Sequence, residues 1–283
     1  MSEMIALGRT DLRVSRICFG CWQMARNEFW PVVDEEAMRE AVGRALELGV
    51  NFFDTADAYG DGFAEELLGR LLKGVPREQF VLADKVYHHW LGSPGSPRVG
   101  DLSCDYIVWE CEQSLRRLGL DHIDLYQAHT FDVLTHPEET TRAFEKLRQA
   151  GKIRHYGVSN FNAEQLRSFR AFGRYETVQP RYNLLDRAAE EDLFPYCMAE
   201  GIGVLTYSSL MYGLLTGKFR GDEKFEDVRA RSPAFAGEAF RRNVERVDRL
   251  RPIAERLGRS VTQVALRFIL EHPAVGCAIA GIK

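Results

Sequence analysis

Apolar positions along the chain alternate between short continuous runs and longer stretches with helical spacing. The first such pair is an apolar run at 16–20, which predicts a strand, followed by the stretch 34–48, which predicts a helix because its apolar residues recur every three to four positions. Asp34 is placed to cap this helix, and Gly49 is placed to end it. The same alternation predicts further strands near 51–54, 80–85, 123–129, 153–159, 177–180, 203–207 and 275–280. It predicts further helices over 64–73, 104–118, 137–150, 163–172, 189–200, 239–257 and 261–270.

Short strands that are apolar on both faces, each joined to the next by a helix, are typical of a parallel sheet covered by helices. Eight such units favour a closed barrel. An open doubly wound sheet is the alternative, but the first strand-helix turn, 19–22, has no GxGxxG dinucleotide fingerprint. We therefore predict an α/β fold, a (β/α)8 TIM barrel formed as a single domain by residues 1–283, preceded by a short hairpin of 5–7 with 14–17. The stretches 91–97 and 220–237 are expected to be long loops.

The C-terminal end of the sequence does not complete this pattern. The sequence stops at Lys283, three residues after the last predicted strand. An eighth helix would be needed there, because an uncovered parallel strand leaves apolar surface in water. We expect that a C-terminal segment after the eighth strand is missing.

Composition and charge narrow the class of protein. The chain has 283 residues, 45% hydrophobic and 28% charged, which is typical of a globular protein. A net charge of −4 does not favour nucleic acid or an anionic membrane as the partner. With no apolar run of the roughly 18 residues that span a membrane and no signal-peptide pattern, a cytoplasmic location is expected. The six cysteines, including the CxxC pair Cys18 and Cys21, are expected to be thiols, with the pair packed in the core.

Four polar residues follow the second, third and fourth predicted strands at their C-terminal ends: Asp54, Tyr59, Lys85 and His129. Each taken alone has a structural explanation, as a turn cap, a rim residue, a strand end in solvent or a core histidine. Because the C-terminal ends of barrel strands meet at one mouth, we expect the four side chains to converge there.

Such a group suits proton donation by the phenol of Tyr59. A tyrosine with a pKa near ~10 is a poor acid at neutral pH unless a neighbour favours the phenolate. At ~4 Å and an effective dielectric constant of ~20, the Lys85 ammonium would stabilise the phenolate by roughly 4 kcal/mol, about three pKa units at most, and burial opposes it. Asp54 would keep Lys85 charged and in place, and His129 would orient a bound oxygen or relay the proton.

Motifs for other chemistries are missing from the sequence. It contains no GxSxG elbow, Walker loop or HExxH motif, and no clustered carboxylates and histidines of the kind that a metal-dependent barrel hydrolase needs, so no metal is assigned. The adjacent His88 and His89 cannot both point the same way from a strand, and we interpret them as loop polarity.

Several sequence blocks resemble the aldo-keto reductase family. They are LGRT at 7–10, NFFDTADAYG at 51–60, GKIR at 151–154, GVSN at 157–160 and LTGK at 215–218, of which DTADAYG and GVSN together are highly specific. The resemblance implies an eight-stranded barrel whose bottom is closed by the N-terminal hairpin. It also implies that the barrel binds an extended nicotinamide dinucleotide, NADP(H), without a Rossmann domain. Asp54, Tyr59, Lys85 and His129 would form the catalytic tetrad, with Tyr59 as the general acid.

The resemblance also assigns a cofactor site. Ser159, Asn160 and Gln179 would hold the carboxamide of the nicotinamide, whose donor and acceptor their side chains can match, and Tyr207 would stack on the ring. Residues 208–213 would wrap the pyrophosphate with Lys218 as a charge partner. A lysine at 283 would favour NADPH through its 2′-phosphate. The full expected cofactor-binding set is Gly20, Cys21, Trp22, Asp54, Ser159, Asn160, Gln179, Tyr207, Ser208, Ser209, Leu210, Gly213, Lys218, Gly281 and Lys283.

Aromatic residues that follow strands one, three and four are expected to form the substrate wall. With two tetrad members, the expected substrate-binding set is Trp22, Tyr59, Tyr87, Trp90, His129 and Phe131. Such a wall prefers apolar or aromatic carbonyl compounds to charged sugars. We expect an NADPH-dependent reductase of aldehydes or ketones, a monomer or weak homo-oligomer. The alternative is a nucleotide-sensing regulatory subunit resembling the β subunits of potassium channels, with little turnover.

Overall fold

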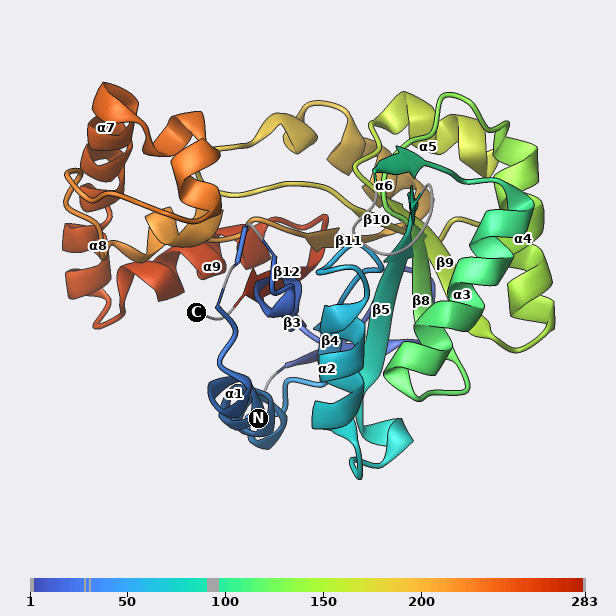
Figure 1. The fold of residues 1–283 in the computed structure, drawn as a ribbon. Helices are drawn as coiled ribbons and strands as arrows, with labels where there is room; N and C mark the ends of the chain where they lie inside the picture. Colours follow the sequence, from blue (N-terminus) through green and yellow to red (C-terminus); the bar gives the residue numbers. More distant parts are fainter. Residues whose placement is uncertain (1–2, 28, 31, 91–96, 282–283) are drawn as a thin grey trace.

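The fold of the chain is given by a computed structural model that describes residues 3–27, 29–30, 32–90 and 97–281, with only the backbone described at 89 and 90. Eight parallel strands close into a barrel in the order β10-β11-β12-β3-β4-β5-β8-β9. The predicted (β/α)8 barrel is confirmed (Figure 1). The barrel strands are β3 Ile17–Gly20, β4 Phe52–Asp54, β5 Val81–Val86, β8 Ile123–Ala128, β9 Ile153–Ser159, β10 Thr177–Gln179, β11 Gly203–Thr206 and β12 Val275–Gly281.

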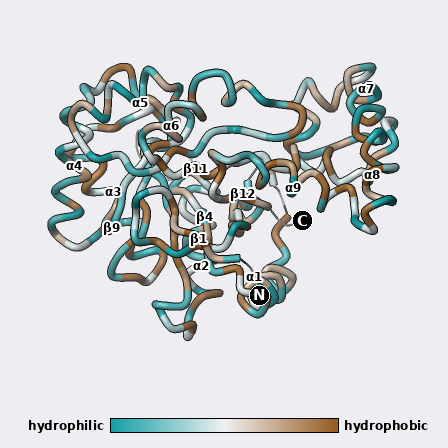
Figure 2. Tube along the Cα trace, turned by 180° about the vertical axis from the view of Figure 1, so that it is seen from behind, coloured by the Kyte–Doolittle hydropathy of each residue, from teal (hydrophilic) through white to brown (hydrophobic). Residues whose placement is uncertain are grey.

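Most of the helices surround the barrel and cover the outer faces of its strands, whereas the two over 237–248 and 251–256 pack on the segment after β11 (Figure 1). The helices are α1 Glu35–Glu47, α2 Phe63–Leu72, α3 Cys104–Leu118, α4 Pro137–Gln149, α5 Ala163–Arg170, α6 Leu193–Glu200, α7 Gly237–Asp248, α8 Arg251–Arg256 and α9 Val261–Glu271. Hydrophobic and hydrophilic stretches alternate along the chain in these helices (Figure 2), as expected when one side of a helix packs on a sheet. Asp34 caps α1 as predicted, since its carboxylate accepts from the backbone N–H groups of Glu36 and Ala37.

The N-terminal hairpin fills the bottom of the barrel. Strands β1 Met4–Ala6 and β2 Arg13–Ser15 pair antiparallel, and Leu7, Leu12 and Val14 pack into the cluster of side chains inside the barrel. Full burial of each such side chain stabilises the fold by roughly 1.5–3 kcal/mol. At the hairpin turn Gly8 has a φ of +59°, and a Cβ there would lie 2.3 Å from the backbone nitrogen of Gly203. The turn therefore needs glycine to dock on the start of β11.

Three predicted segments differ from the structure. The helix expected over 239–257 is two helices, α7 and α8, because Pro252 in the first turn of α8 has no N–H to donate to a preceding turn. The loop expected over 91–97 lies largely outside the described residues and is flanked by an antiparallel pair, β6 His88–Trp90 and β7 Arg98–Gly100. The loop over 220–237 contains two short 3₁₀ helices, η5 Val228–Arg231 and η6 Pro233–Phe235.

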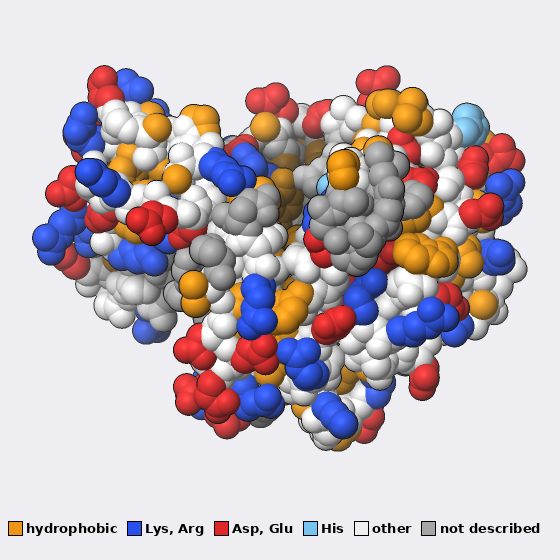
Figure 3. Space-filling view, in the orientation of Figure 1, with side chains coloured by type: hydrophobic (Ala, Val, Ile, Leu, Met, Phe, Trp, Pro, Cys, Tyr) orange, Lys and Arg blue, Asp and Glu red, His pale blue; other side chains and the backbone are white. Residues whose placement is uncertain are grey.

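The distribution of charged side chains on the surface and the state of the cysteines agree with what the composition predicts. Lysine and arginine side chains are interspersed with aspartate and glutamate over the face seen in Figure 3. All six cysteines are free and buried, which confirms that they are thiols. Among the described residues, no helix combines the length and apolar character needed to cross a membrane.

A cluster of buried acidic groups lies between the barrel and helices α2 and α3. Arg117 on α3 donates from Nε to Glu65 Oε2 at 2.7 Å and also pairs with Glu110, and both carboxylates are fully buried. Asp84 on β5 is buried too; its Oδ1 accepts from the backbone N–H of Lys85 at 2.8 Å, while Oδ2 has no hydrogen-bond partner among the described residues. Burial, followed by the nearby Glu65, raises the pKa of Asp84 well above its usual range.

Asp84→Asn is expected to raise the free energy of unfolding by about 1–2 kcal/mol near pH 8, since it removes a poorly compensated buried acid, and to change it little near pH 4. A carboxyl whose pKa is raised by folding stabilises the protein below the unfolded pKa, and this contribution is lost as the pH rises through the folded pKa. Asparagine does not titrate. Urea unfolding at the two pH values, with the exposed Asp121→Asn as control, measures the difference. Destabilisation by Asp84→Asn near pH 8 would contradict a raised pKa, since it would show that the folded protein is more stable with the Asp84 carboxylate.

Candidate active site

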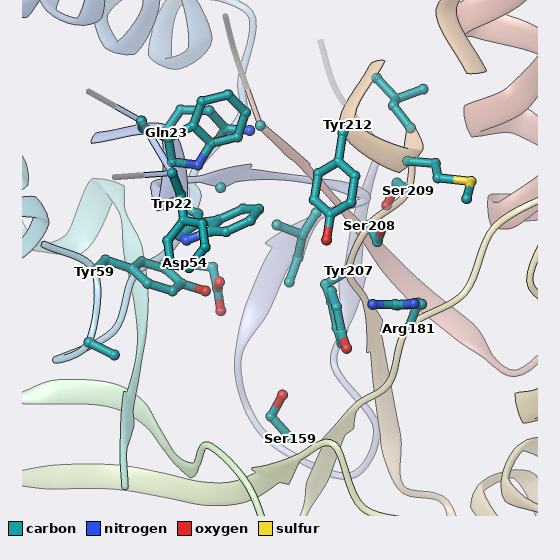
Figure 4. A pocket seen from close by; sticks show the side chains of 18 of the residues that line it. Trp22, Gln23, Asp54, Tyr59, Ser159, Arg181, Tyr207, Ser208, Ser209 and Tyr212 are labelled. Atoms are coloured by element: carbon teal, nitrogen blue, oxygen red, sulfur yellow. The ribbon is translucent and has the colours of Figure 1, made fainter. Parts of the chain in front are cut away.

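A deep pocket opens at the C-terminal ends of the barrel strands (Figure 4). Its volume is about 830 Å³, within the range of pockets that hold cofactors and small substrates. Asp54 comes from the end of β4, Tyr59 from the loop after it, and His129 from the residue after β8. Lys85, on β5, is buried beneath Tyr59 and Asp54.

The ammonium of Lys85 joins the other groups. Its Nζ donates to Asp54 Oδ1 at 2.6 Å, to the backbone oxygen of Thr55 at 2.8 Å and to the hydroxyl of Tyr59 at 3.2 Å. The ring of His129 meets the ring of Tyr59 edge-on with centroids 5.9 Å apart. The structure thus brings all four predicted tetrad residues together.

Burial dominates the protonation of Tyr59. Removal from water raises the pKa of Tyr59 to about 12, against the opposing attraction of Lys85. The pKa of Tyr59 is therefore raised overall, although the charge of Lys85 alone would lower it. For Lys85, burial acts to lower the pKa, but Asp54 and then Tyr59 hold it above its usual value. The site combines a neutral phenol with an ammonium ion at neutral pH.

Asp57 supports this arrangement from below. Its carboxylate accepts from the backbone N–H groups of Ala58 at 2.5 Å and of Tyr87 and His88 at 3.3 Å, and its Oδ1 lies 4.0 Å from His129 Nδ1. Burial lowers the pKa of His129, with Asp57 acting in the opposite direction. The imidazole of His129 is therefore neutral at pH 7 and is available to a bound oxygen.

The residues predicted to hold the nicotinamide carboxamide form a hydrogen-bonded chain beside the tetrad. Gln179 donates from Nε2 to Asp54 Oδ2 at 2.7 Å, and Ser159 Oγ donates to the backbone oxygen of Gln179 at 3.0 Å. Asn160 donates from Nδ2 to the backbone oxygen of His129 at 2.9 Å and accepts from the hydroxyl of Tyr207 at 2.6 Å. Figure 4 shows Tyr207 across the pocket from Tyr59 and Asp54.

Most of the remaining predicted cofactor residues also line the pocket: Gly20, Trp22, Ser208, Ser209, Leu210, Gly213, Lys218 and Gly281. Cys21 is not among the residues that line the pocket, contrary to expectation. It is fully buried behind the pocket, where its N–H donates to the backbone oxygen of Asp54 at 2.9 Å and its sulfur faces the backbone oxygen of Phe19. Lys283 lies outside the described residues.

Two of the aromatic residues predicted for the substrate wall, Tyr87 and Phe131, do not line the pocket. Phe131 packs edge-on against Phe161, with centroids 5.4 Å apart, and not into the pocket. Tyr87 fills the space above Gly100 of β7, where a Cβ would lie 2.1 Å from its hydroxyl. Phe131 thus packs among other phenylalanine rings, whereas the ring of Tyr87 lies beside that of His88, with centroids 5.1 Å apart. The side chain of Trp90 lies outside the described residues.

Trp22 alone of the four predicted wall aromatics is described as lining the pocket, and it does so within a different aromatic group. Its ring lies 5.4 Å from Trp30 and 5.7 Å from Tyr212, centroid to centroid. Trp30 belongs to the loop after β3 and Tyr212 to the loop after β11. The two loops also meet through a backbone hydrogen bond from Val228 to Phe29 at 3.2 Å. The wall is therefore built from loops and not from strand ends.

Sequence reasoning missed several residues of the pocket. Those not anticipated are Gln23, Asn27, Phe29, Trp30, Ala58, Asp61, His88, Arg98, Arg181, Thr216, Arg229 and Ile279. Most lie on loops without a motif. Arg181 offered a signal, since it comes two residues after Gln179 at a strand end. His88, interpreted from sequence as loop polarity, lies on β6 with its ring 5.2 Å from that of His129.

Unusual backbone conformations concentrate around the pocket. Among the described residues, six that are not glycine have a positive φ: Arg26, Asp61, Asn160, Ser208, Met211 and Tyr212. All of these but Arg26 line the pocket. Such conformations cost free energy and gather at ligand-binding sites, where surrounding structure holds them. Within the same described part of the chain, no three histidine, cysteine or acidic side chains are placed to hold a metal ion.

Comparison with known proteins agrees with this geometry. The model of the Aldo/keto reductase family matches residues 16–283. The aldo-keto reductase YhdN of Bacillus subtilis (strain 168) is 39% identical, over 99% of this chain and 85% of its own. The NADH-specific methylglyoxal reductase of Escherichia coli (strain K12) is 33% identical, over 99% and 89% of the two chains.

A solved structure and a further relative are also similar to this chain over nearly its whole length. The glycerol dehydrogenase of Gluconobacter oxydans superposes with a TM-score of 0.90 at 36% identity, covering 99% of this chain and 86% of that one. A probable voltage-gated potassium channel β subunit of Arabidopsis thaliana is also similar, 33% identical over 97% of this chain and 85% of its own. With a family model that spans nearly the whole sequence, this chain belongs to the aldo/keto reductase family.

Proposed function

We propose that the protein reduces an aldehyde or ketone to the alcohol with hydride from NADPH. Members of the family are oxidoreductases that generally bind a nicotinamide cofactor. The observation that carries the proposal is the position of the Tyr59 hydroxyl, 3.2 Å from Lys85 Nζ, in a pocket that also contains Ser159, Asn160 and Gln179. The pocket holds an acid, a cation to stabilise its conjugate base, and amide groups for a carboxamide.

The pocket residues fit a nicotinamide dinucleotide. The buried Oε1 atom of Gln23 has no hydrogen-bond partner among the described residues, so a polar acceptor is left for a ligand in this pocket. The cationic side chains of Arg181 and Lys218 line the same pocket and suit phosphate groups, and Arg229 lines it too but pairs with Asp227. Tyr207 offers an aromatic face for the nicotinamide ring.

In this proposal each residue has one task. The bound nicotinamide supplies the hydride, and the protein supplies position and electrostatics. Tyr59 donates its hydroxyl proton to the carbonyl oxygen, and Lys85 stabilises the phenolate that results. Asp54 keeps Lys85 charged through the 2.6 Å contact. His129, neutral and next to Tyr59, orients the carbonyl oxygen.

Fluorescence titration with NADPH and NADH, followed by a panel of aldehydes and ketones with the tighter nucleotide, tests the proposal. We expect NADPH to bind at least about tenfold more tightly, the equivalent of one charge-assisted hydrogen bond to an added phosphate, and to support turnover. Tighter binding of NADH, the cofactor named for the Escherichia coli relative, would contradict the proposed preference for NADPH. It would leave the proposed carbonyl reduction unchanged.

A second candidate is a nucleotide-sensing regulatory subunit, which the similarity to the Arabidopsis channel subunit supports. The tetrad does not separate the two functions. Tight NADPH binding with negligible reduction across the whole carbonyl panel would favour the regulatory function over the reductase.

A further inference from the structure

Next to Tyr59 the pocket has an aromatic side, which includes Trp22, and a polar side (Figure 4). The rings of Tyr59, His129 and His88 form a row, with centroid distances of 5.9 Å and 5.2 Å between neighbours. Arg98 and Asp61 line the same pocket and pair with each other. Of the aromatic rings expected here from sequence, Phe131 packs against Phe161 away from the pocket, and Tyr87 packs behind His88 without lining the pocket itself.

His88 is held firmly in this row. Its backbone N–H donates to Asp57 Oδ2 at 3.3 Å, and its backbone oxygen accepts from the hydroxyl of Tyr106 at 2.8 Å. Its ring packs edge-on against Tyr87 on one side and His129 on the other. The ring nitrogens make no hydrogen bond to the described residues, so they are available to a ligand in the pocket.

We infer that His88 is a specificity-determining residue that binds a second oxygen of the substrate, close to the carbonyl group being reduced. This inference rests on the proposed reductase function. If Tyr59 and His129 hold the carbonyl oxygen, the next ring in the row faces the substituent on an adjacent carbon. An imidazole ring presents a donor and an acceptor, which matches a hydroxyl or a second carbonyl group. The substrate class is therefore a small oxygenated aldehyde or ketone.

The charge of this region favours a neutral oxygen over a carboxylate. Arg98 lines the pocket, but the Asp61 carboxylate pairs with it and offsets its charge. Its Nη1 also approaches the backbone oxygen of Ala58 at 3.5 Å. An anionic substituent would meet Asp61 as well as Arg98 and would gain little from the pair.

The test compares glyceraldehyde with propanal, which has the same carbon chain without hydroxyl groups. We expect kcat/KM of the wild type to favour glyceraldehyde, and His88→Leu to lower kcat/KM for glyceraldehyde about tenfold or more, mainly through KM, since about one hydrogen bond is lost. kcat/KM for propanal and the Kd of NADPH should change less than about twofold. His88→Asn, which keeps a donor and an acceptor, should retain part of the preference.

Three results would overturn the inference: a wild type without preference for glyceraldehyde, an equal loss for both aldehydes in His88→Leu, or a carboxylated aldehyde preferred over glyceraldehyde. The Kd of NADPH shows that each variant is folded. A wild type that binds NADPH but reduces neither aldehyde, nor any other carbonyl compound, would overturn the proposed function itself, which distinguishes the two failures.

Discussion

Tyr59→Phe is expected to lower kcat for carbonyl reduction by about 10³-fold or more, in the upper part of the range for loss of a general acid. The variant removes only the hydroxyl that lies 3.2 Å from Lys85 Nζ. The ring, and with it the edge-on contact to His129, is retained. The Kd of NADPH should therefore stay nearly unchanged. Single-turnover rates at saturating NADPH, together with fluorescence titration of the nucleotide, measure both quantities.

Tyr196→Phe, on the outer helix α6, is the matched control, and its kcat should equal that of the wild type. The pH profile adds a second measurement. Because burial raises the pKa of Tyr59 to about 12, the acid form persists through neutral pH, and the reduction rate should fall only in strongly alkaline solution. A Tyr59→Phe variant that keeps a tenth or more of the wild-type turnover would contradict the assignment of Tyr59 as the acid.

Lys85→Met is expected to have the second largest effect. It removes the cation that stabilises the phenolate and leaves the Asp54 carboxylate buried without its partner at 2.6 Å. Breaking a buried ion pair from one side costs about 3–5 kcal/mol of stability. We expect kcat to fall by about 10³-fold, comparable to the loss of the acid itself. Steady-state kinetics and urea unfolding measure the two losses.

The double variant Asp54→Asn with Lys85→Met separates stability from catalysis. It removes the unpaired charge, and Gln179 Nε2, which donates to Asp54 Oδ2 at 2.7 Å, keeps an oxygen to donate to. Most of the lost stability should return while kcat stays low. Activity restored together with stability would mean that Lys85 acts only as a structural partner of Asp54.

The sequence predicted what depends on periodic pattern. Runs such as 123–129, apolar on both faces and separated by amphipathic stretches, determine a covered parallel sheet, and its closure brings Asp54, Lys85 and His129 to one mouth. The predicted Ser159, Asn160 and Gln179 also lie at strand ends, where direction follows from register. Their catalytic and cofactor-binding roles remain predictions.

The sequence did not predict which loop side chains point into the pocket. Tyr87 and Phe131 follow strand ends as closely as His88 does, yet only His88 lines the pocket. The direction of each side chain depends on partners distant in sequence, such as Gly100 beneath Tyr87 and Phe161 beside Phe131. The pKa of Tyr59 likewise depends on burial, which is a property of the folded pocket and not of the residues next to Tyr59 in the sequence.

The most direct test of the central claim is the path of the hydride, followed with NADPH that carries deuterium at one or the other of its two C4 positions. If Tyr207 covers one face of the nicotinamide and Tyr59 protonates the oxygen on the other, only one C4 epimer delivers its label. We predict one deuterium on the carbinol carbon with that epimer and none with the other. Label delivered equally from both epimers, or from neither while alcohol forms, would contradict a hydride transferred at this site.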